Sequence, residues 1–90
     1  MSPGSTFEVP AHVVARRIGD DSVILDLQSG TYFGLDPVGA RIFELVAQGR
    51  ALGDIQRTIL AEYEVAADVL EADLERLLDD LQSHGLVTAR

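Results

Sequence analysis

Two short runs in the first half of the chain alternate apolar and other residues, which is the spacing of β-strands. They cover residues 23–27 and 32–35, and residues 28–30, Gln-Ser-Gly, interrupt them. This pattern predicts a β-hairpin. An earlier strand over residues 13–17, followed by a turn at residues 19–21, places residues 23–27 in the middle, because short connections join antiparallel neighbours. The sequence therefore predicts a three-stranded antiparallel sheet in which residues 32–35 form one edge.

This predicted edge strand lacks the usual protection of an exposed sheet edge. Its N–H and C=O groups are unpaired on one side, and proteins normally blunt such edges with lysine, proline or a bulge. Here the strand carries Tyr32, Phe33 and Leu35 instead. We therefore expect this edge to be the working surface, open to another peptide or to a second copy of the chain in a homodimer.

After residue 35 the apolar positions take the spacing of helices. Asp36 followed by Pro37 predicts the start of a first helix, because aspartate caps helices and proline suits the first helical position. Gly49 is expected to end this helix. A second helix is expected from about residue 52 to residue 64.

A third helix is expected from about Asp68 to Gly85. Asp68, with Glu71 three residues later, resembles a capping box with aspartate in place of serine or threonine. Gly85 suits a left-handed C-terminal cap, after which Leu86 and Val87 fold back as an apolar tail. The apolar stripe of this helix consists of Leu70, Leu74, Leu77, Leu78 and Leu81.

The order of elements, three strands and then three helices, predicts an α+β domain with the helices on one face of the sheet. The second and third helices resemble a winged helix-turn-helix in which the hairpin is the wing. Residues 1–8 are expected to form a flexible N-terminal arm, and residues 9–90 a single domain. Phe7 and Val9 are candidates to join the sheet.

Composition limits what such a domain can do. A chain of 90 residues with 47% hydrophobic content supports one modest core and no separate catalytic domain. The absence of cysteine excludes disulfides and thiolate metal sites. No apolar run approaches about 20 residues, so we expect a cytoplasmic protein. His12 and His84 are the only histidines, and no metal-ligand spacing or nucleophile accompanies them, so we expect neither catalysis nor a bound cofactor.

The charge argues against a nucleic-acid partner. The chain holds 15 acidic and 7 basic residues, for a net charge of −8, and such a balance repels phosphate. A winged-helix DNA-binding protein or transcription regulator is still an alternative, although the expected reading helix carries six acidic residues and Arg76 as its one base. An acyl-carrier-like protein is a further alternative, because residues 19–22, Gly-Asp-Asp-Ser, resemble the attachment motif of carriers. That serine should begin a helix, whereas Ser22 precedes a strand pattern and is expected to be a turn residue.

A set of spaced positions runs through most of the chain: Ile24, Leu25, Asp26, Leu27, Gly30, Thr31, Tyr32, Phe33, Leu35, Asp36, Gly39, Ile42, Tyr63, Glu64, Val65, Asp73, Leu77, Leu81, Gly85, Leu86 and Val87. Together they resemble the PqqD-like family of leader-recognition domains, the RiPP recognition elements of ribosomally made, post-translationally modified peptide pathways. The resemblance is strongest to the stand-alone leader-binding subunit of lasso peptide biosynthesis. It covers about residues 9–87 and contains no catalytic signature.

The resemblance implies that the leader of a precursor peptide adds as an antiparallel strand beside the third strand and sends side chains into a groove against the third helix. Strand addition of this kind draws affinity from main-chain hydrogen bonds and specificity from side-chain pockets. It further implies an aromatic and a proline of a Tyr-x-x-Pro leader segment as anchors, and a separate transglutaminase-like cysteine protease as the leader peptidase. The implied leader-binding residues are Thr31, Tyr32, Phe33, Gly34, Leu35, Val69, Leu70, Asp73, Leu74 and Leu77.

Structural roles compete with binding at several of these positions. Tyr32, Phe33 and Leu35 are core residues wherever they point inward, and the leucines of the third helix are more often core than groove. The apolar stripe of the third helix is wider than packing against a single neighbour requires, so this helix can contribute both to the core and to the groove. Asp73 is either a solvated charge or a partner for a polar or cationic leader group.

Overall fold

The computed structural model describes residues 2–90, and its centre is a three-stranded antiparallel sheet. The strands are β2 (Val13–Ile18), β3 (Asp21–Asp26) and β4 (Tyr32–Leu35), in the spatial order β2-β3-β4. The three predicted strands are therefore confirmed, with β3 in the middle and β4 at one edge.

The middle strand begins earlier than its alternation predicts. Ile18 pairs with Asp21, so Gly19 and Asp20 alone form the turn, and Gly19 has a φ of +64°. Ser22 pairs with Arg17 within the ladder. The prediction that residues 21 and 22 belong to the turn is therefore wrong, because a glycine with positive φ permits a two-residue connection.

Three helices follow the sheet: α1 (Pro37–Ala47), α2 (Leu52–Glu62) and α3 (Ala67–Ser83). The cap of α1 is confirmed, since Asp36 Oδ1 accepts a hydrogen bond of 2.7 Å from the N–H of Gly39. Gly49 and Gly85, with φ of +80° and +70°, end α1 and α3 as predicted.

The predicted capping box of α3 is wrong. This helix starts at Ala67, its N-cap is Ala66, and no side chain caps it. Asp68 therefore lies inside the first turn and does not cap the helix. Its carboxylate is stabilised there by the positive end of the helix dipole.

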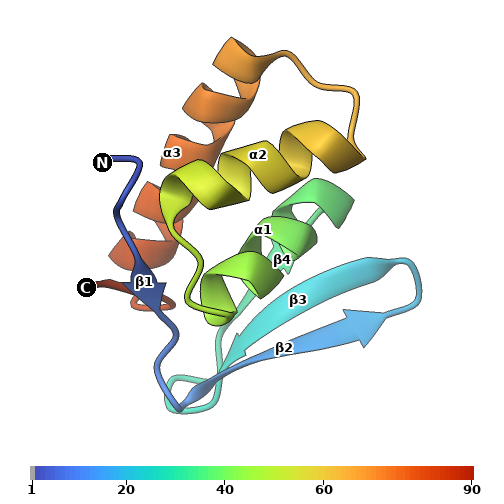
Figure 1. Ribbon diagram of the computed structural model, residues 1–90. Helices are drawn as coiled ribbons and strands as arrows, with labels where there is room; N and C mark the ends of the chain where they lie inside the picture. Colours follow the sequence, from blue (N-terminus) through green and yellow to red (C-terminus); the bar gives the residue numbers. More distant parts are fainter. Residues whose placement is uncertain (1) are drawn as a thin grey trace.

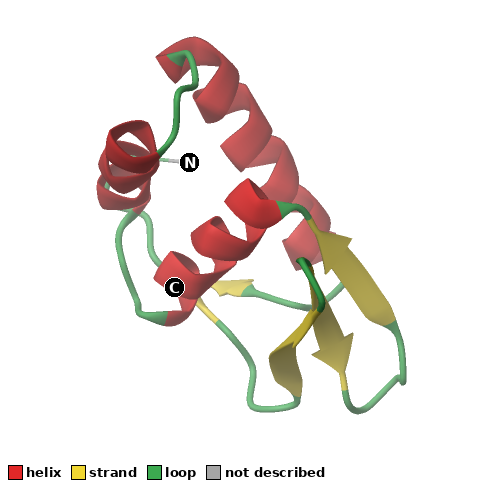
Figure 2. Ribbon diagram, turned by 90° about the vertical axis from the view of Figure 1, so that its right-hand side faces the viewer, coloured by secondary structure: helices red, strands yellow, loops and turns green. Residues whose placement is uncertain are grey.

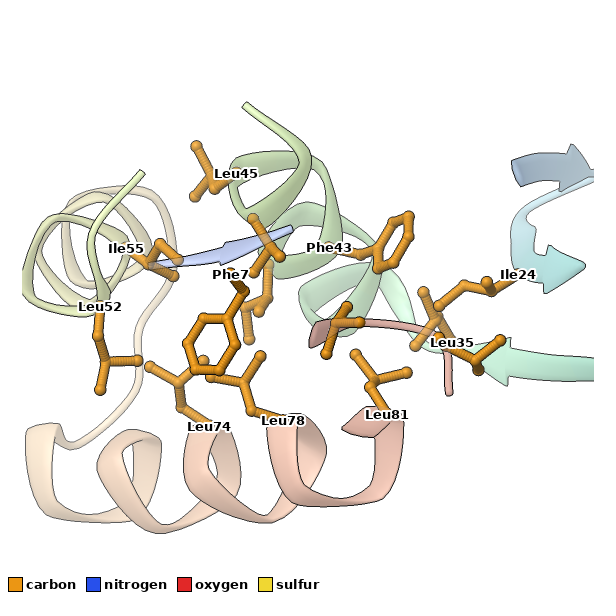
Figure 3. Packing of buried hydrophobic residues seen from close by; sticks show 14 of the residues in the cluster. Phe7, Ile24, Leu35, Phe43, Leu45, Leu52, Ile55, Leu74, Leu78 and Leu81 are labelled. Carbon is orange, nitrogen blue, oxygen red and sulfur yellow. The ribbon is translucent and has the colours of Figure 1, made fainter. Parts of the chain in front are cut away.

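All three helices lie on one face of the three-stranded sheet (Figures 1 and 2). Helix α1 contacts β3 and β4 directly, and α2 packs against both α1 and α3. The core between them is apolar (Figure 3), and within residues 2–90 it contains no buried polar or charged side chain. Its most enclosed side chains are Ile24, Leu45, Val46, Ile55, Ile59, Leu74, Leu78, Leu81 and Val87.

The first residues do not extend the three-stranded sheet. Instead β1 (Phe7–Glu8) pairs antiparallel with β5 (Thr88–Ala89), which forms a separate two-stranded sheet that the sequence pattern did not predict. Phe7 is 2% exposed and points into the core (Figure 3), while Val9 lies outside any strand. The carbonyl of Ser5 accepts a 2.8 Å hydrogen bond from the N–H of Leu52, which ties the segment to α2. The expected arm of residues 1–8 starts at Met1, which lies outside the described residues, and its flexibility stays a prediction.

Over residues 2–90, none of the helices combines the length and the apolar character needed to cross a bilayer.

Candidate functional site

One side of β4 has no partner strand among the described residues. Hydrogen-bonded and non-hydrogen-bonded pairs alternate along an antiparallel ladder. The Asp26 N–H donates to the carbonyl of Thr31 at 2.9 Å, so Phe33 and Leu35 also bond to β3. The N–H and C=O groups of Tyr32 and Gly34 consequently point away from β3, toward the open edge. The N-terminal residues do not fill this edge, because β1 pairs with β5 instead.

A groove of about 410 Å³ lies beside this edge, between β4 and α3. The first turns of α1 also contribute to its lining. Apolar side chains and glycines predominate in its lining, with charged groups among them. The lining residues are Phe33, Gly34, Leu35, Asp36, Val38, Gly39, Ile42, Val65, Val69, Leu70, Asp73, Arg76, Leu77 and Asp80.

Helix α3 serves the core and the groove with two adjacent faces. Leu70, Leu74, Leu78 and Leu81 are buried at spacings of four, four and three residues, which is one helical face. The positions one residue earlier in the chain, Val69, Asp73, Leu77 and Asp80, repeat those spacings about 100° around the helix and line the groove.

The structure brings seven of the ten predicted site residues to the groove: Phe33, Gly34, Leu35, Val69, Leu70, Asp73 and Leu77. Three lie elsewhere. Thr31 precedes β4, and Tyr32 is 74% exposed on the sheet face turned away from the helices. Leu74 is 1% exposed and points into the core with Phe7 and Leu52 (Figure 3).

Sequence reasoning missed the other half of the lining: Asp36, Val38, Gly39, Ile42, Val65, Arg76 and Asp80. Arg76 and Asp80 could have been found by continuing the helical spacing from Asp73. The contributions of α1 and of Val65, in the connection between α2 and α3, depend on how the helices pack and leave no local signal.

The groove carries more negative than positive charge. Asp73 accepts a 2.9 Å hydrogen bond from Arg76, and Asp36 is engaged as the cap of α1. His84 stacks its ring edge-on against Phe33, with 5.5 Å between ring centroids, and its Nδ1 lies 2.7 Å from the carbonyl oxygen of Asp80. Within residues 2–90 no group of three or more His, Asp or Glu side chains is arranged to hold a metal ion. The groove therefore combines a mainly apolar lining with a net negative charge.

A second hollow, of about 690 Å³, lies between β2 and α1 and includes Arg16, Arg17, Phe43 and Tyr63. It shares only Leu35 with the groove. The two hollows adjoin at this residue and at the start of α1.

Comparisons with known proteins agree on this architecture. The family model described as coenzyme PQQ synthesis protein D (PqqD) matches residues 21–87. Among solved structures, "TbiB1 in complex with the TbiA(beta) leader peptide" is 41% identical, with a TM-score of 0.79, over 89% of this chain and 93% of that chain. "Lasso peptide synthetase B1 complexed with the leader peptide" is 26% identical, with a TM-score of 0.80, over 90% of this chain and 95% of that chain. No curated protein matches the sequence.

Proposed function

The chain belongs to the PqqD family, and from this membership we propose that it is a non-catalytic adaptor that binds the leader of a ribosomally made precursor peptide. The leader adds as an antiparallel strand to β4 and places alternate side chains in the groove against α3. The maturation of a lasso peptide is the proposed setting, supported by the two similar structures, both of which are leader-peptide complexes.

One observation carries this proposal: an unpaired strand edge runs directly beside an apolar groove. Tyr32 and Gly34 turn their main-chain groups to that edge, while Phe33 and Leu35 turn their side chains toward the helices. Hydrogen bonds to the edge supply affinity that depends little on sequence, and the groove supplies specificity. The exposed side of α3 carries several carboxylates, which disfavours the alternative in which this helix reads DNA.

The adaptor is proposed to act in the cytoplasm and to present the leader to a separate leader peptidase, a transglutaminase-like cysteine protease. Holding the precursor near that enzyme raises the effective concentration of the cleavage site. The second hollow supports this role, because it is lined by residues of β2 and α1 that, apart from Leu35, lie outside the groove proposed for the leader. With limiting precursor, we expect cleavage by the peptidase to be faster when the adaptor is present, and equal rates would contradict presentation.

Leader binding is tested by fluorescence anisotropy with a labelled leader peptide. Val69 is 54% exposed and lines the groove, so Val69→Asp should leave the fold intact and weaken binding at least about tenfold, since an apolar anchor then meets a carboxylate. The matched control is Leu60→Asp, which alters an exposed apolar residue of α2 outside the groove. Leu74→Asp is unsuitable, because a charge at that buried position disrupts the core.

A homodimer through the β4 edge is the competing use of the same main-chain groups. If it forms, leader and second copy exclude one another, and sedimentation should show dissociation as leader is added. Leader binding that leaves a dimer intact would place the self-association elsewhere.

A further inference from the structure

The carboxylate of one of the three aspartates that line the groove has no hydrogen-bond or ion-pair partner within residues 2–90. Its lining includes Asp36, Asp73 and Asp80 against a single cation, Arg76. Asp73 forms an ion pair with Arg76, and Asp36 accepts a hydrogen bond from the N–H of Gly39. The carboxylate of Asp80 makes no hydrogen bond or ion pair with any of residues 2–90.

The position of Asp80 along the groove follows from its neighbours. His84, the C-cap of α3, lies about one helical turn beyond Asp80 and contacts Phe33, near the start of β4. The Asp80 end of α3 therefore lies at the Phe33 end of β4. A strand antiparallel to β4 passes Leu35 first and Phe33 afterwards, so its C-terminal part comes nearest to Asp80.

From this geometry we infer that the groove selects leaders that carry a lysine or arginine on the C-terminal side of the apolar anchors, where the cation pairs with Asp80. The inference rests on the proposed function, because it assigns the charge preference of the same site. A leader cation at this position would form an ion pair with Asp80, whereas a leader glutamate would be repelled by the carboxylate of Asp80. Pairs at exposed positions change affinity by about two- to fivefold.

The chain offers a matched control for this charge. Asp79 is the preceding residue of α3, is likewise exposed, and does not line the groove. Asp79→Asn and Asp80→Asn therefore remove the same charge from the same helix turn, and they differ only in their position relative to the groove.

The test uses the TbiA(beta) leader peptide, labelled with fluorescein, and a series in which each position of its C-terminal half is replaced singly by lysine or by glutamate. At low salt, one position should bind the unaltered chain about two- to fivefold more tightly with lysine than with glutamate. Asp80→Asn should abolish this preference, Asp79→Asn should retain it, and high salt should reduce it.

Equal effects of the two variants would overturn the inference, because they would reduce the preference to the net charge of −8 acting at long range. Equal binding of lysine and glutamate peptides at every position would also overturn it. In both cases binding that is still lost in Val69→Asp leaves the proposed function standing. Failure of the unaltered chain to bind any peptide of the series would overturn the proposed function and this inference together.

Discussion

Proline at position 34 should separate leader binding from folding. The N–H of Gly34 points toward the open edge and is not part of the ladder with β3. Proline removes that donor and fixes φ near −65°, which edge strands tolerate where the missing N–H faced solvent. We therefore expect Gly34→Pro to change the free energy of unfolding by less than about 1 kcal/mol.

The cost to binding is larger. Strand addition would lose one hydrogen bond, worth about 0.5–1.5 kcal/mol net, and would leave a leader carbonyl unpaired in the interface. Together these effects weaken binding by about 1–3 kcal/mol, or about 5- to 150-fold in Kd. Anisotropy titration with a labelled leader peptide measures the change, and urea denaturation checks the fold.

Gly34→Ala is the control for this substitution. It keeps the N–H, and a Cβ at this position meets no atom within 4 Å, so binding should change by less than about 0.5 kcal/mol. If Gly34→Pro binds the leader as tightly as Gly34→Ala, the leader does not hydrogen-bond to Gly34, and addition to the β4 edge is refuted even if the groove is occupied.

Three further predictions concern stability. Phe7→Ala should lower the free energy of unfolding by about 3–5 kcal/mol in urea denaturation, because it leaves a cavity in the core. Little or no loss of stability would instead indicate that the N-terminal segment is dispensable for folding. Gly85→Ala should cost about 1–2 kcal/mol by the same measurement, because alanine is strained at a φ of +70°. Hydrogen bonds from Arg41 to both carboxylate oxygens of Glu62, at 2.9 Å, lower the pKa of Glu62. The ion pair therefore stabilises the fold above pH about 4.5, and this contribution is lost as the pH falls through the lowered pKa. Glu62→Gln should show a smaller difference in unfolding free energy between pH 7 and pH 3 than the unaltered chain.

Local patterns in the sequence were sufficient for most of the architecture. Asp36 before Pro37, and glycines after two of the helices, predicted boundaries because capping and left-handed turns depend on adjacent residues. The pairing of β1 with β5 left no such signal, since each strand has two residues and Phe7 meets Ala89 from the far end of the chain.

The candidate site could be predicted only in part, for a related reason. The stripe of leucines on α3 is too wide for sequence to decide which members face the core. The structure resolves this, because Leu74 is buried in the core with Phe7 and Leu52, whereas Leu77 is only partly buried and lines the groove. The contribution of α1 to the lining depends on tertiary packing alone.

The two-stranded sheet of β1 and β5 has a consequence for engineering. It holds the first and last strands as neighbours, on a part of the molecule that contributes nothing to the groove (Figure 1). A short linker joining the two ends, with new ends opened in the turn at Gly19, should give a circularly permuted domain that still captures peptide. The same proximity would allow the domain to be inserted whole into a surface loop of an enzyme, which would convert a diffusing adaptor into a built-in substrate holder.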